Sequence, residues 1–377
     1  MRRIVISTIG TSLLTNQINR SNPEEKDWYT KLRDFANHNQ KDTPQPVQDI
    51  IQQLRRRASK KLAQSKLEII RRSSAELNGL YGLYDNQLTS GKQDTHFLIS
   101  TATYQCKTTA EVIRDFLQQQ GLSSVDIYTP PGLSTASTED FTNGIDELIV
   151  WLRENIPAYK EKGFKVYFNL VGGFKSLQGY LNTIGMFYAD EILYIFEGKN
   201  AELITIPRLP ISLDCKAIKP HRIALALMDA GLTMPFKEEI LESLVLTIDK
   251  EMTLSTWGKL VWGECKNSLL SQELLAFPRI ILEDTFRHDY NQITRPEDKV
   301  KLQETLATVS YLLQENNGDT APLKKHGGIK YGNLNKSIKG KPIGHFRVTN
   351  GLRITCIAKN GVLHLRRYGQ HAINDNP

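Results

Sequence analysis

The sequence predicts an α/β protein that is long enough, at 377 residues, for two or three domains. Over the first 214 residues, short apolar runs rich in β-branched residues alternate with segments of helical apolar spacing. From about residue 277 the order changes to one strand-like run, a helical region and consecutive strand-like runs. The first order is typical of a parallel sheet with helices on both faces, and the second of an α+β domain with an antiparallel sheet.

Residues 1–214 are expected to form a Rossmann-like domain. The predicted strands are RRIVIST, HFLIS, SVDIY, KVYFN and EILYIF, and helices such as TTAEVIRDFLQQQ and EDFTNGIDELIVWLREN lie between them. Residues 22–92 are polar and rich in Gln, Lys and Arg, and we interpret them as a mostly helical insertion. In such sheets ligands bind beyond the carboxyl ends of the strands, so the loops there are the first place to seek a site.

Two further domains are expected. Residues 215–276 contain HRIALALMDAGL, FKEEILESLVLTI and TWGKLVWGECKNSLLSQELLAF, which predict a helical connector compatible with a winged helix. In residues 277–377, RIILEDTF is strand-like, PEDKVKLQETLATVSYLLQEN is helical, and HFRVTN, GLRITCIAKN and GVLHLRRYG predict a meander. The Asn-Gly of AKNG suits the type I′ turn of a hairpin.

Cysteine spacing and hydropathy narrow the class of protein. The four cysteines have no C-x-x-C spacing, so we expect neither a disulfide framework nor a zinc site but buried or incidental thiols: Cys106, Cys215, Cys265 and Cys356. No apolar run approaches the roughly 20 residues of a membrane span, and none resembles a signal-peptide core. We therefore expect a cytoplasmic protein without a membrane partner.

Basic charge is concentrated near the C-terminus. The net charge is +7, yet residues 321–377 alone carry +10, so the preceding residues sum to −3. Lys and Arg at this density suit a polyanion, because neutralising phosphates releases condensed counterions. A solvated basic face is the alternative interpretation.

A glycine-rich loop in the first domain has the features of a phosphate site. In NLVGGFKS, Gly172 and Gly173 allow close approach of the backbone, and Lys175 and Ser176 begin the next helix near its positive dipole. The glycine pair could instead serve packing alone.

Together with STIGTS after the first strand, this VGGFKS loop resembles the CARF family over roughly residues 1–210. The resemblance implies a homodimer that binds a cyclic oligoadenylate, with cyclic tetra-adenylate the commoner ring, and no other cofactor. It implies ligand contacts on both loops, and Thr101, Thr103 and Gln105 after the second strand are weaker candidates by position. The loop residues are Gly10, Thr11, Ser12, Leu13, Asn169, Gly172, Gly173, Phe174 and Lys175. A dinucleotide-binding enzyme is the competitor, but no G-x-G-x-x-G or Walker A sequence is present.

Histidines gather in the basic C-terminal region. Four of the eight, His326, His345, His364 and His371, lie in the last 52 residues. Metal-free RNA cleavage needs a base for the 2′-hydroxyl, an acid for the leaving oxygen and cations for the phosphorane, and no acidic cluster here suggests a metal site. Strand alternation predicts that His364, Arg366 and Tyr368 share the open face of the sheet.

The last hundred residues resemble the RelE toxin superfamily, in particular its YafQ-type branch. The pattern is a strand, two helices, a Lys-His loop and HFRVTNGLRITCIAKNGVLHLRRYGQHAI. The resemblance implies a ribosome-dependent mRNA interferase, with acid/base residues His371, His345 and His326 and phosphate contacts from Arg353 and Arg366. The family's aromatic residue after the terminal His is missing here, and Tyr331 or Tyr368 could replace it.

CARF and RelE in one chain imply an effector of type III CRISPR antiviral defence, switched on by cyclic oligoadenylate. Two alternatives stay open. The spacing from Arg366 to His371 fits the signature of a HEPN ribonuclease acting on free RNA, although the segment is strand-like rather than helical. A CARF transcriptional regulator could use the connector and the basic tail to bind nucleic acid without cleaving it.

Overall fold

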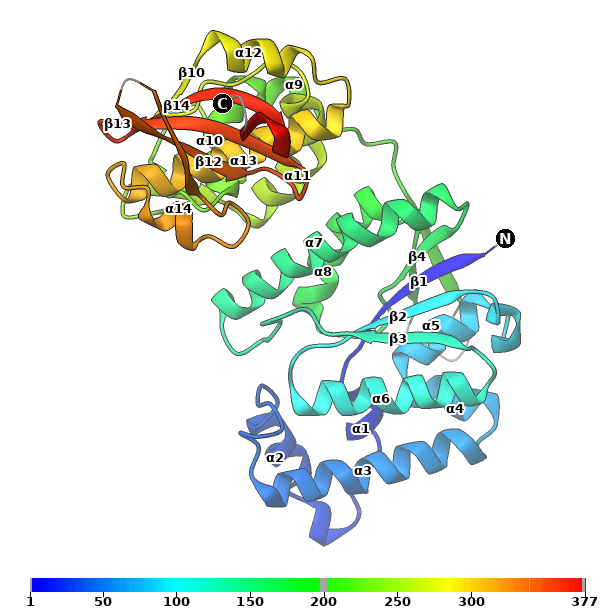
Figure 1. The fold of residues 1–377 in the computed structure, drawn as a ribbon. Helices are drawn as coiled ribbons and strands as arrows, with labels where there is room; N and C mark the ends of the chain where they lie inside the picture. Colours follow the sequence, from blue (N-terminus) through cyan, green and yellow to red (C-terminus); the bar gives the residue numbers. More distant parts are fainter. Residues whose placement is uncertain (1, 197–201, 339, 375–376) are drawn as a thin grey trace. The chain divides into compact units, whose positions relative to one another are not determined.

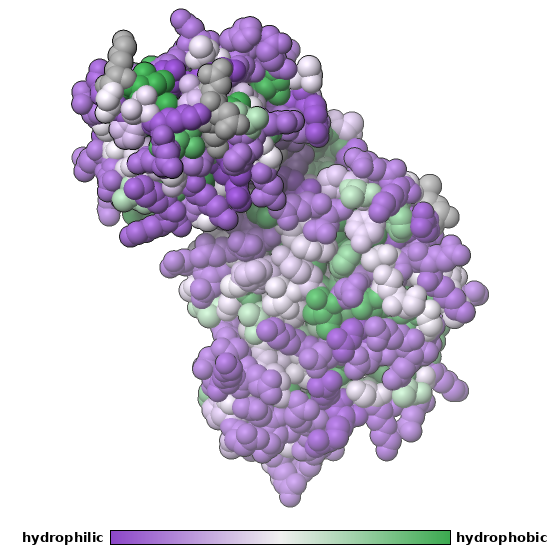
Figure 2. All heavy atoms as spheres, viewed as in Figure 1, coloured by the Kyte–Doolittle hydropathy of each residue, from purple (hydrophilic) through white to green (hydrophobic). Residues whose placement is uncertain are grey.

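The computed structural model describes residues 2–196, 202–338, 340–374 and 377. The chain forms two compact units, Met1–Ile211 (unit 1) and Ser212–Pro377 (unit 2), with parallel and antiparallel sheets among its helices (Figure 1). Hydrophilic residues cover most of the visible face of each unit (Figure 2). No helix in the described ranges is long and apolar enough to cross a membrane.

Unit 1 is built on a six-stranded sheet in the order β3-β2-β1-β4-β5-β6. The strands are β1 (Arg3–Thr8), β2 (Thr95–Ile99), β3 (Ser124–Tyr128), β4 (Lys165–Asn169), β5 (Glu191–Ile195) and β6 (Leu203–Pro207). The first five are parallel to their neighbours, as predicted, and β6 runs antiparallel to β5. The strand order reverses between β1 and β4, which makes the carboxyl ends of these two strands a topological switch point.

Helices cover both faces of this sheet. Figure 1 shows α7 and α8 on one side and α6 and α3 on the other. The helices are α1 (Ser12–Thr15), α2 (Trp28–Asp34), α3 (Gln45–Gln64), α4 (Leu67–Ser73), α5 (Ala75–Leu83), α6 (Tyr104–Gln119), α7 (Thr138–Glu161) and α8 (Lys175–Tyr188), with 3₁₀ turns η1 (Pro23–Glu25) and η2 (Leu88–Gly91). Residues 22–92 are mostly helical, as expected, and α3, α4 and α5 share one apolar core with α6 and the sheet.

Unit 2 packs helices against one face of a five-stranded sheet, order β10-β14-β13-β12-β11. Its helices are α9 (Cys215–Ile218), α10 (Arg222–Asp229), α11 (Thr256–Leu270), α12 (Asp284–Asn291), α13 (Pro296–Glu315) and α14 (Ala321–Lys325), with 3₁₀ turns η3 (Lys219–His221), η4 (Glu242–Leu244) and η5 (His371–Asn374). Its strands are β7 (Met234–Pro235), β8 (Val245–Ile248), β9 (Glu251–Leu254), β10 (Ile280–Leu282), β11 (Gly332–Ile338), β12 (Lys341–Arg347), β13 (Leu352–Lys359) and β14 (Val362–Gln370).

The order of strand, helices and antiparallel meander is present in unit 2. Strand β10 pairs parallel to β14, and β11 to β14 form the meander. Asn360 and Gly361 have φ values of 52° and 72°, as a type I′ turn requires. The sequence had suggested three strands in the meander, whereas β11 adds a fourth.

One prediction for residues 215–276 is wrong. FKEEILESLVLTI is not a helix but a loop, a short 3₁₀ turn and strand β8. Strand β8 forms a hairpin with β9 through Asp249 and Lys250, whose φ values are 51° and 67°. Pairing of the VLTI run with β9 therefore prevails over the helical spacing of its apolar residues.

The interpretation of all four cysteines as thiols is also wrong. Cys215 in α9 and Cys265 in α11 form a disulfide across 50 positions of sequence, with their Cα atoms 5.4 Å apart. Packing of the two helices brings them together, which sequence spacing cannot reveal. Cys106 and Cys356 are buried free thiols, as expected.

Residues 215–276 and 277–377 share one hydrophobic core. Trp262 of α11 and Leu306 of α13 belong to the same buried cluster as Phe346 and Leu363 of the sheet. The segment that we interpret as a connector therefore packs within unit 2 rather than standing apart from the C-terminal segment.

Candidate functional site

The loops after β1 and β4 meet at the switch point of the unit 1 sheet. The Thr8 hydroxyl, at the end of β1, donates a hydrogen bond to the Gly172 carbonyl. Gly173 has a φ of +99°, and a Cβ atom there would lie 2.8 Å from the Thr8 Cβ. Only glycine suits this conformation and this close approach. The structure thus brings together the two loops that the sequence singled out.

Helix α8 begins directly at this junction. Its N-cap residue, Phe174, makes no side-chain capping bond, so the first-turn N–H groups lack the partner that a cap would supply. Lys175 and Ser176, in the first turn, are exposed. Free N–H donors, the helix dipole and a lysine form a suitable environment for an anionic oxygen.

The other predicted ligand residues divide by exposure. Thr11 and Ser12 are partly exposed beside the loop junction. Leu13 is fully buried in the apolar core, so its side chain packs rather than faces solvent. Asn169 is also fully buried, and its Nδ2 atom donates to the Ser7 hydroxyl at 3.2 Å.

The two threonines after β2 lie inside the protein. Their hydroxyl oxygens are 3.0 Å apart, and Thr101 and Thr103 are 2% and 1% exposed. Thr103 also caps α6 by accepting the Cys106 N–H. The side chains of Thr101 and Thr103 are thus engaged in local structure.

Sequence reasoning missed Glu76, which lies beneath both loops. Its Oε1 atom accepts the Gly10 N–H at 2.7 Å, and its Oε2 atom accepts the Ser74 hydroxyl at 2.7 Å. The side chain belongs to α5, within the segment interpreted as an insertion. The sequence signals were Gly10 and Gly172, because a glycine can indicate that another group packs closely against the backbone, but it does not identify that group.

Residues 71–209 match the family model of a CRISPR-associated protein, Cas_APE2256. The match supports a CRISPR-associated protein. It spans α5 with Glu76, strands β2 to β6 and the Gly172–Gly173 loop, and it excludes β1 and all of unit 2.

Unit 2 carries a second cluster, on the face of its sheet that points away from the helices. His345 and Arg347 of β12 lie directly opposite Thr355 and Arg353 of β13. Residues opposite one another, or two apart along a strand, share a face of a sheet. The alternate residues Phe346 and Ile354 are fully buried in the core. We call these four residues, His345, Arg347, Arg353 and Thr355, the β12–β13 block.

Polar atoms of the block are buried without partners. The Nδ1 atom of His345, the Nε atom of Arg347 and the Oγ1 atom of Thr355 have no hydrogen-bond partner among the described residues. Arg353 donates to the Thr349 carbonyl at 2.7 Å, but among the described residues neither arginine of the block has an acidic partner. Like charges directly opposite on a sheet repel, so an anion would stabilise this face.

His371 lies close to the block. Burial, with the nearby charges of Arg353 and then His371, lowers the pKa of His345. Burial and Arg347 lower the pKa of Arg353. Turn η5, which begins at His371, packs on β13 and β14. The structure therefore brings together three predicted residues and adds one that was missed, Arg347.

Other predicted residues lie elsewhere. Arg366 pairs with Glu283 beside β10, with Nη1 and Oε2 3.3 Å apart. His326 is exposed at the end of α14, where its Nδ1 atom accepts the Gly328 and Ile329 N–H groups. No hydrogen bond or ion pair in the described chain joins either residue to the block.

The prediction that Tyr368 lies on the open face of β14 is wrong. The pairing of β13 with β14 shifts by one residue at Thr355 and Cys356, so a β-bulge interrupts the alternation. Tyr368 turns inward against Phe286 and is 8% exposed. Tyr331 is equally buried. The sequence suggested that one of these tyrosines could stack on a base, but neither ring is exposed for stacking.

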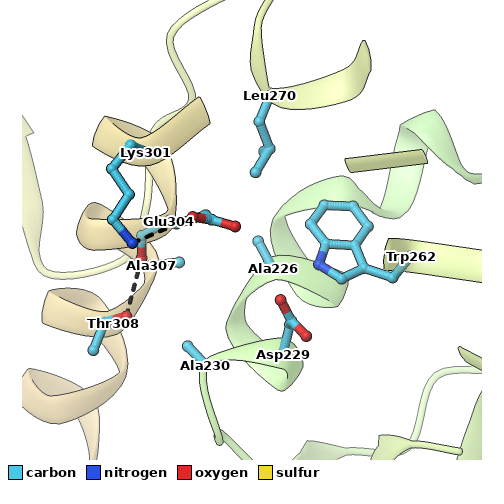
Figure 3. Close-up of a pocket in the computed structure, with 9 residues that line it drawn as sticks. All are labelled: Ala226, Asp229, Ala230, Trp262, Leu270, Lys301, Glu304, Ala307 and Thr308. Atoms are coloured by element: carbon cyan, nitrogen blue, oxygen red, sulfur yellow. Dashed lines mark hydrogen bonds and ion pairs between the residues drawn. The ribbon is translucent and has the colours of Figure 1, made fainter. Parts of the chain in front are cut away.

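A pocket of mixed polar and apolar lining lies between α10, α11 and α13, apart from the block (Figure 3). The carboxylates of Asp229 and Glu304 reach into it from opposite sides. Lys266 bridges them, 3.6 Å from the first and 2.6 Å from the second. The bridge joins three helices, and no predicted catalytic residue lines the pocket.

Proposed function

We propose that the chain is a cyclic oligoadenylate-activated ribonuclease of CRISPR antiviral defence that works as a homodimer and without a metal ion. The β12–β13 block carries the nuclease part of this proposal. An imidazole with a lowered pKa lies beside two arginines that have no acidic partner in the described chain, and a second imidazole lies nearby. These are the groups that metal-free RNA cleavage requires.

The chemistry follows from the charges of these groups. With its pKa lowered, His345 is neutral at physiological pH and can accept the proton of a ribose 2′-hydroxyl. The 2′-oxygen attacks the adjacent phosphorus, and the bond to the 5′-oxygen breaks as His371 supplies a proton. The products are a 2′,3′-cyclic phosphate and a 5′-hydroxyl end. Arg347 and Arg353 would stabilise the additional negative charge of the phosphorane.

The sensor part rests on the loop junction of unit 1. A cyclic oligoadenylate presents phosphates that suit the first turn of α8 and Lys175. The match of residues 71–209 to a CRISPR-associated family supports this context. The resemblance to CARF proteins supplies the ligand class and the two-fold arrangement, in which each protomer would hold half of the ring.

Messenger RNA on the ribosome is the proposed substrate, because of the resemblance to RelE toxins. The test is cleavage of an mRNA, free and in programmed 70S ribosomes, with and without cyclic tetra-adenylate. The variants are His345→Ala and His371→Ala, and the matched control is His288→Ala, an exposed histidine of α12. We expect cleavage only with ligand and ribosomes, lost in the first two variants and kept in the control.

The other outcomes separate the alternatives. Ligand-stimulated cleavage of free mRNA would favour a ribosome-independent nuclease such as a HEPN-like enzyme. Tight ligand binding without cleavage of either substrate would favour a regulator that binds nucleic acid. Equal cleavage with and without ligand would remove the switch but leave the nuclease.

A further inference from the structure

We propose that Glu76 is a positioning residue that holds the two loops of the ligand site in one arrangement, which makes helix α5 part of the sensor. The proposal rests on the function proposed above for unit 1. The Glu76 side chain is 1% exposed, and its two oxygens accept from Gly10 of the first loop and from Ser74, the N-cap residue of α5. The carboxylate thus ties the first loop to the start of the helix.

The second loop packs on the same carboxylate. A Cβ atom at Gly172 would lie 2.3 Å from the Glu76 Oε1 atom, so only a glycine leaves room for the Glu76 side chain at this position. Asn169, the last residue of β4, donates from Nδ2 to the Glu76 carbonyl at 3.0 Å. A Cβ atom at Gly79, one turn further along α5, would lie 2.1 Å from the Asn169 Oδ1 atom. Strand β4 and its loop are therefore fitted to α5 at three points.

These contacts change the part assigned to two predicted ligand residues. The Gly10 N–H is already engaged by Glu76, and the Asn169 amide is buried against α5. Neither the Gly10 N–H nor the Asn169 amide faces solvent, so both residues affect a ligand only by fixing the conformation of the loops. The groups left for ligand are those of Thr11, Ser12 and the start of α8, which are at least partly exposed.

Removal of the carboxylate should therefore release both loops. In Glu76→Ala the Gly10 N–H and the Ser74 hydroxyl lose their acceptor, and a gap opens beneath Gly172. In Glu76→Gln the amide oxygen still accepts from Gly10, and the Ser74 hydroxyl can turn to accept from the amide nitrogen. The matched control is Glu68→Ala, which alters a 74% exposed glutamate of the neighbouring helix α4.

The experiment uses the full chain and two readouts. Hydrogen exchange measures protection of the Gly10 amide without ligand, and calorimetry measures affinity for cyclic tetra-adenylate. We expect Glu76→Ala to lose the protection of the Gly10 amide and to bind cyclic tetra-adenylate at least about tenfold more weakly. A tenfold change corresponds to the loss of one charge-assisted hydrogen bond. Glu76→Gln should retain most of both properties, and Glu68→Ala should match wild type.

Each outcome has one meaning. Unchanged Gly10 exchange in Glu76→Ala would overturn the proposal whatever the ligand does. Faster exchange with wild-type affinity would also overturn it, because ligand binding would not need the fixed loops. If wild type binds no cyclic tetra-adenylate, the proposed ligand fails, and the exchange readout still decides whether Glu76 holds the loop.

Discussion

Substitution by alanine should destabilise unit 1 at Gly173 and stabilise it at Gly179, six residues further along the chain. Gly173 lies in the loop before α8 with a φ of +99°, and Gly179 lies in α8, where an added Cβ atom would meet nothing within 4 Å. Alanine at Gly173 must occupy a disfavoured backbone region, which costs about 1–3 kcal/mol of folding free energy. Alanine at Gly179 removes glycine from a helix, which stabilises by about 0.5–1 kcal/mol.

The contact with Thr8 adds to the first cost. The new methyl would lie 2.8 Å from the Thr8 Cβ atom, which is well inside normal contact distance. Thr8 is fully buried, and its hydroxyl donates to the Gly172 carbonyl, so rotation away loses a hydrogen bond worth about 1 kcal/mol. The total for Gly173→Ala is about 2–4 kcal/mol, or a fall in the Tm of unit 1 of roughly 5–15 °C.

Differential scanning calorimetry of the full chain measures both variants, and the unfolding transition of unit 1 is compared with that of wild type. We expect the Tm of the unit 1 transition to fall in Gly173→Ala and to rise by a few degrees in Gly179→Ala. Cyclic tetra-adenylate binding should also weaken in the first variant only. If Gly173→Ala unfolds at or above the temperature of Gly179→Ala, the reasoning from the positive φ and the Thr8 contact is refuted.

Three more predictions concern pH and the disulfide. Burial lowers the pKa of His96 to about 4, below its unfolded value of about 6.5, so a contribution to stability on the order of 3 kcal/mol is present above pH 6.5 and lost as the pH falls toward 4. Urea unfolding of wild type and His96→Gln at both pH values measures this loss, and equal pH dependence in the two proteins would contradict the prediction. Arg353→Gln should raise the pKa of His345 and move the acidic limb of the cleavage pH profile to higher pH, whereas an unmoved limb would exclude His345 as the base. Replacement of Cys215 and Cys265 by serine should cost unit 2 up to about 4 kcal/mol in urea unfolding, and an unchanged midpoint would mean that the pair is not oxidised.

Strands β1 to β5 of unit 1 could be predicted because each is short, apolar and followed by a polar or glycine-containing turn, whereas β6 was not predicted. The run IVIST before Gly10 and the run VYFN before Gly172 are examples. Residues 236–248 show where the same reasoning fails. Their apolar residues have helical spacing, but Asp249 and Lys250 adopt positive φ values without the Gly or Asn that usually marks such a turn. The local signals of the β8–β9 hairpin are only the β-branched residues of VLTI and Asp249, and pairing with β9 decides between strand and helix.

Strand β14 shows a failure of a different kind. Alternation correctly places Leu363 and Leu365 in the core, and it holds until the bulge opposite Thr355 and Cys356. After the bulge every side chain changes face, so Tyr368 is buried and a candidate stacking residue is lost. Arg347 was missed for a related reason. Its membership of the block depends on the register of β12 with β13, and pairing rather than composition sets that register.

The loop junction shows what a glycine can and cannot reveal. Gly10, Gly79 and Gly172 each lie where a Cβ atom would come within 3.5 Å of a neighbouring atom. The sequence shows that each position lacks a side chain, but it does not show which neighbour requires the space. Glu76, which approaches both Gly10 and Gly172, lies 66 positions after Gly10, at the start of a helix in the polar segment 22–92. A buried glutamate in such a segment looks like any surface glutamate until the fold places it. The sequence therefore predicted the two loops that meet at the junction but not the residue beneath them, and Glu76→Ala is the substitution that measures how far that residue holds the loops in place.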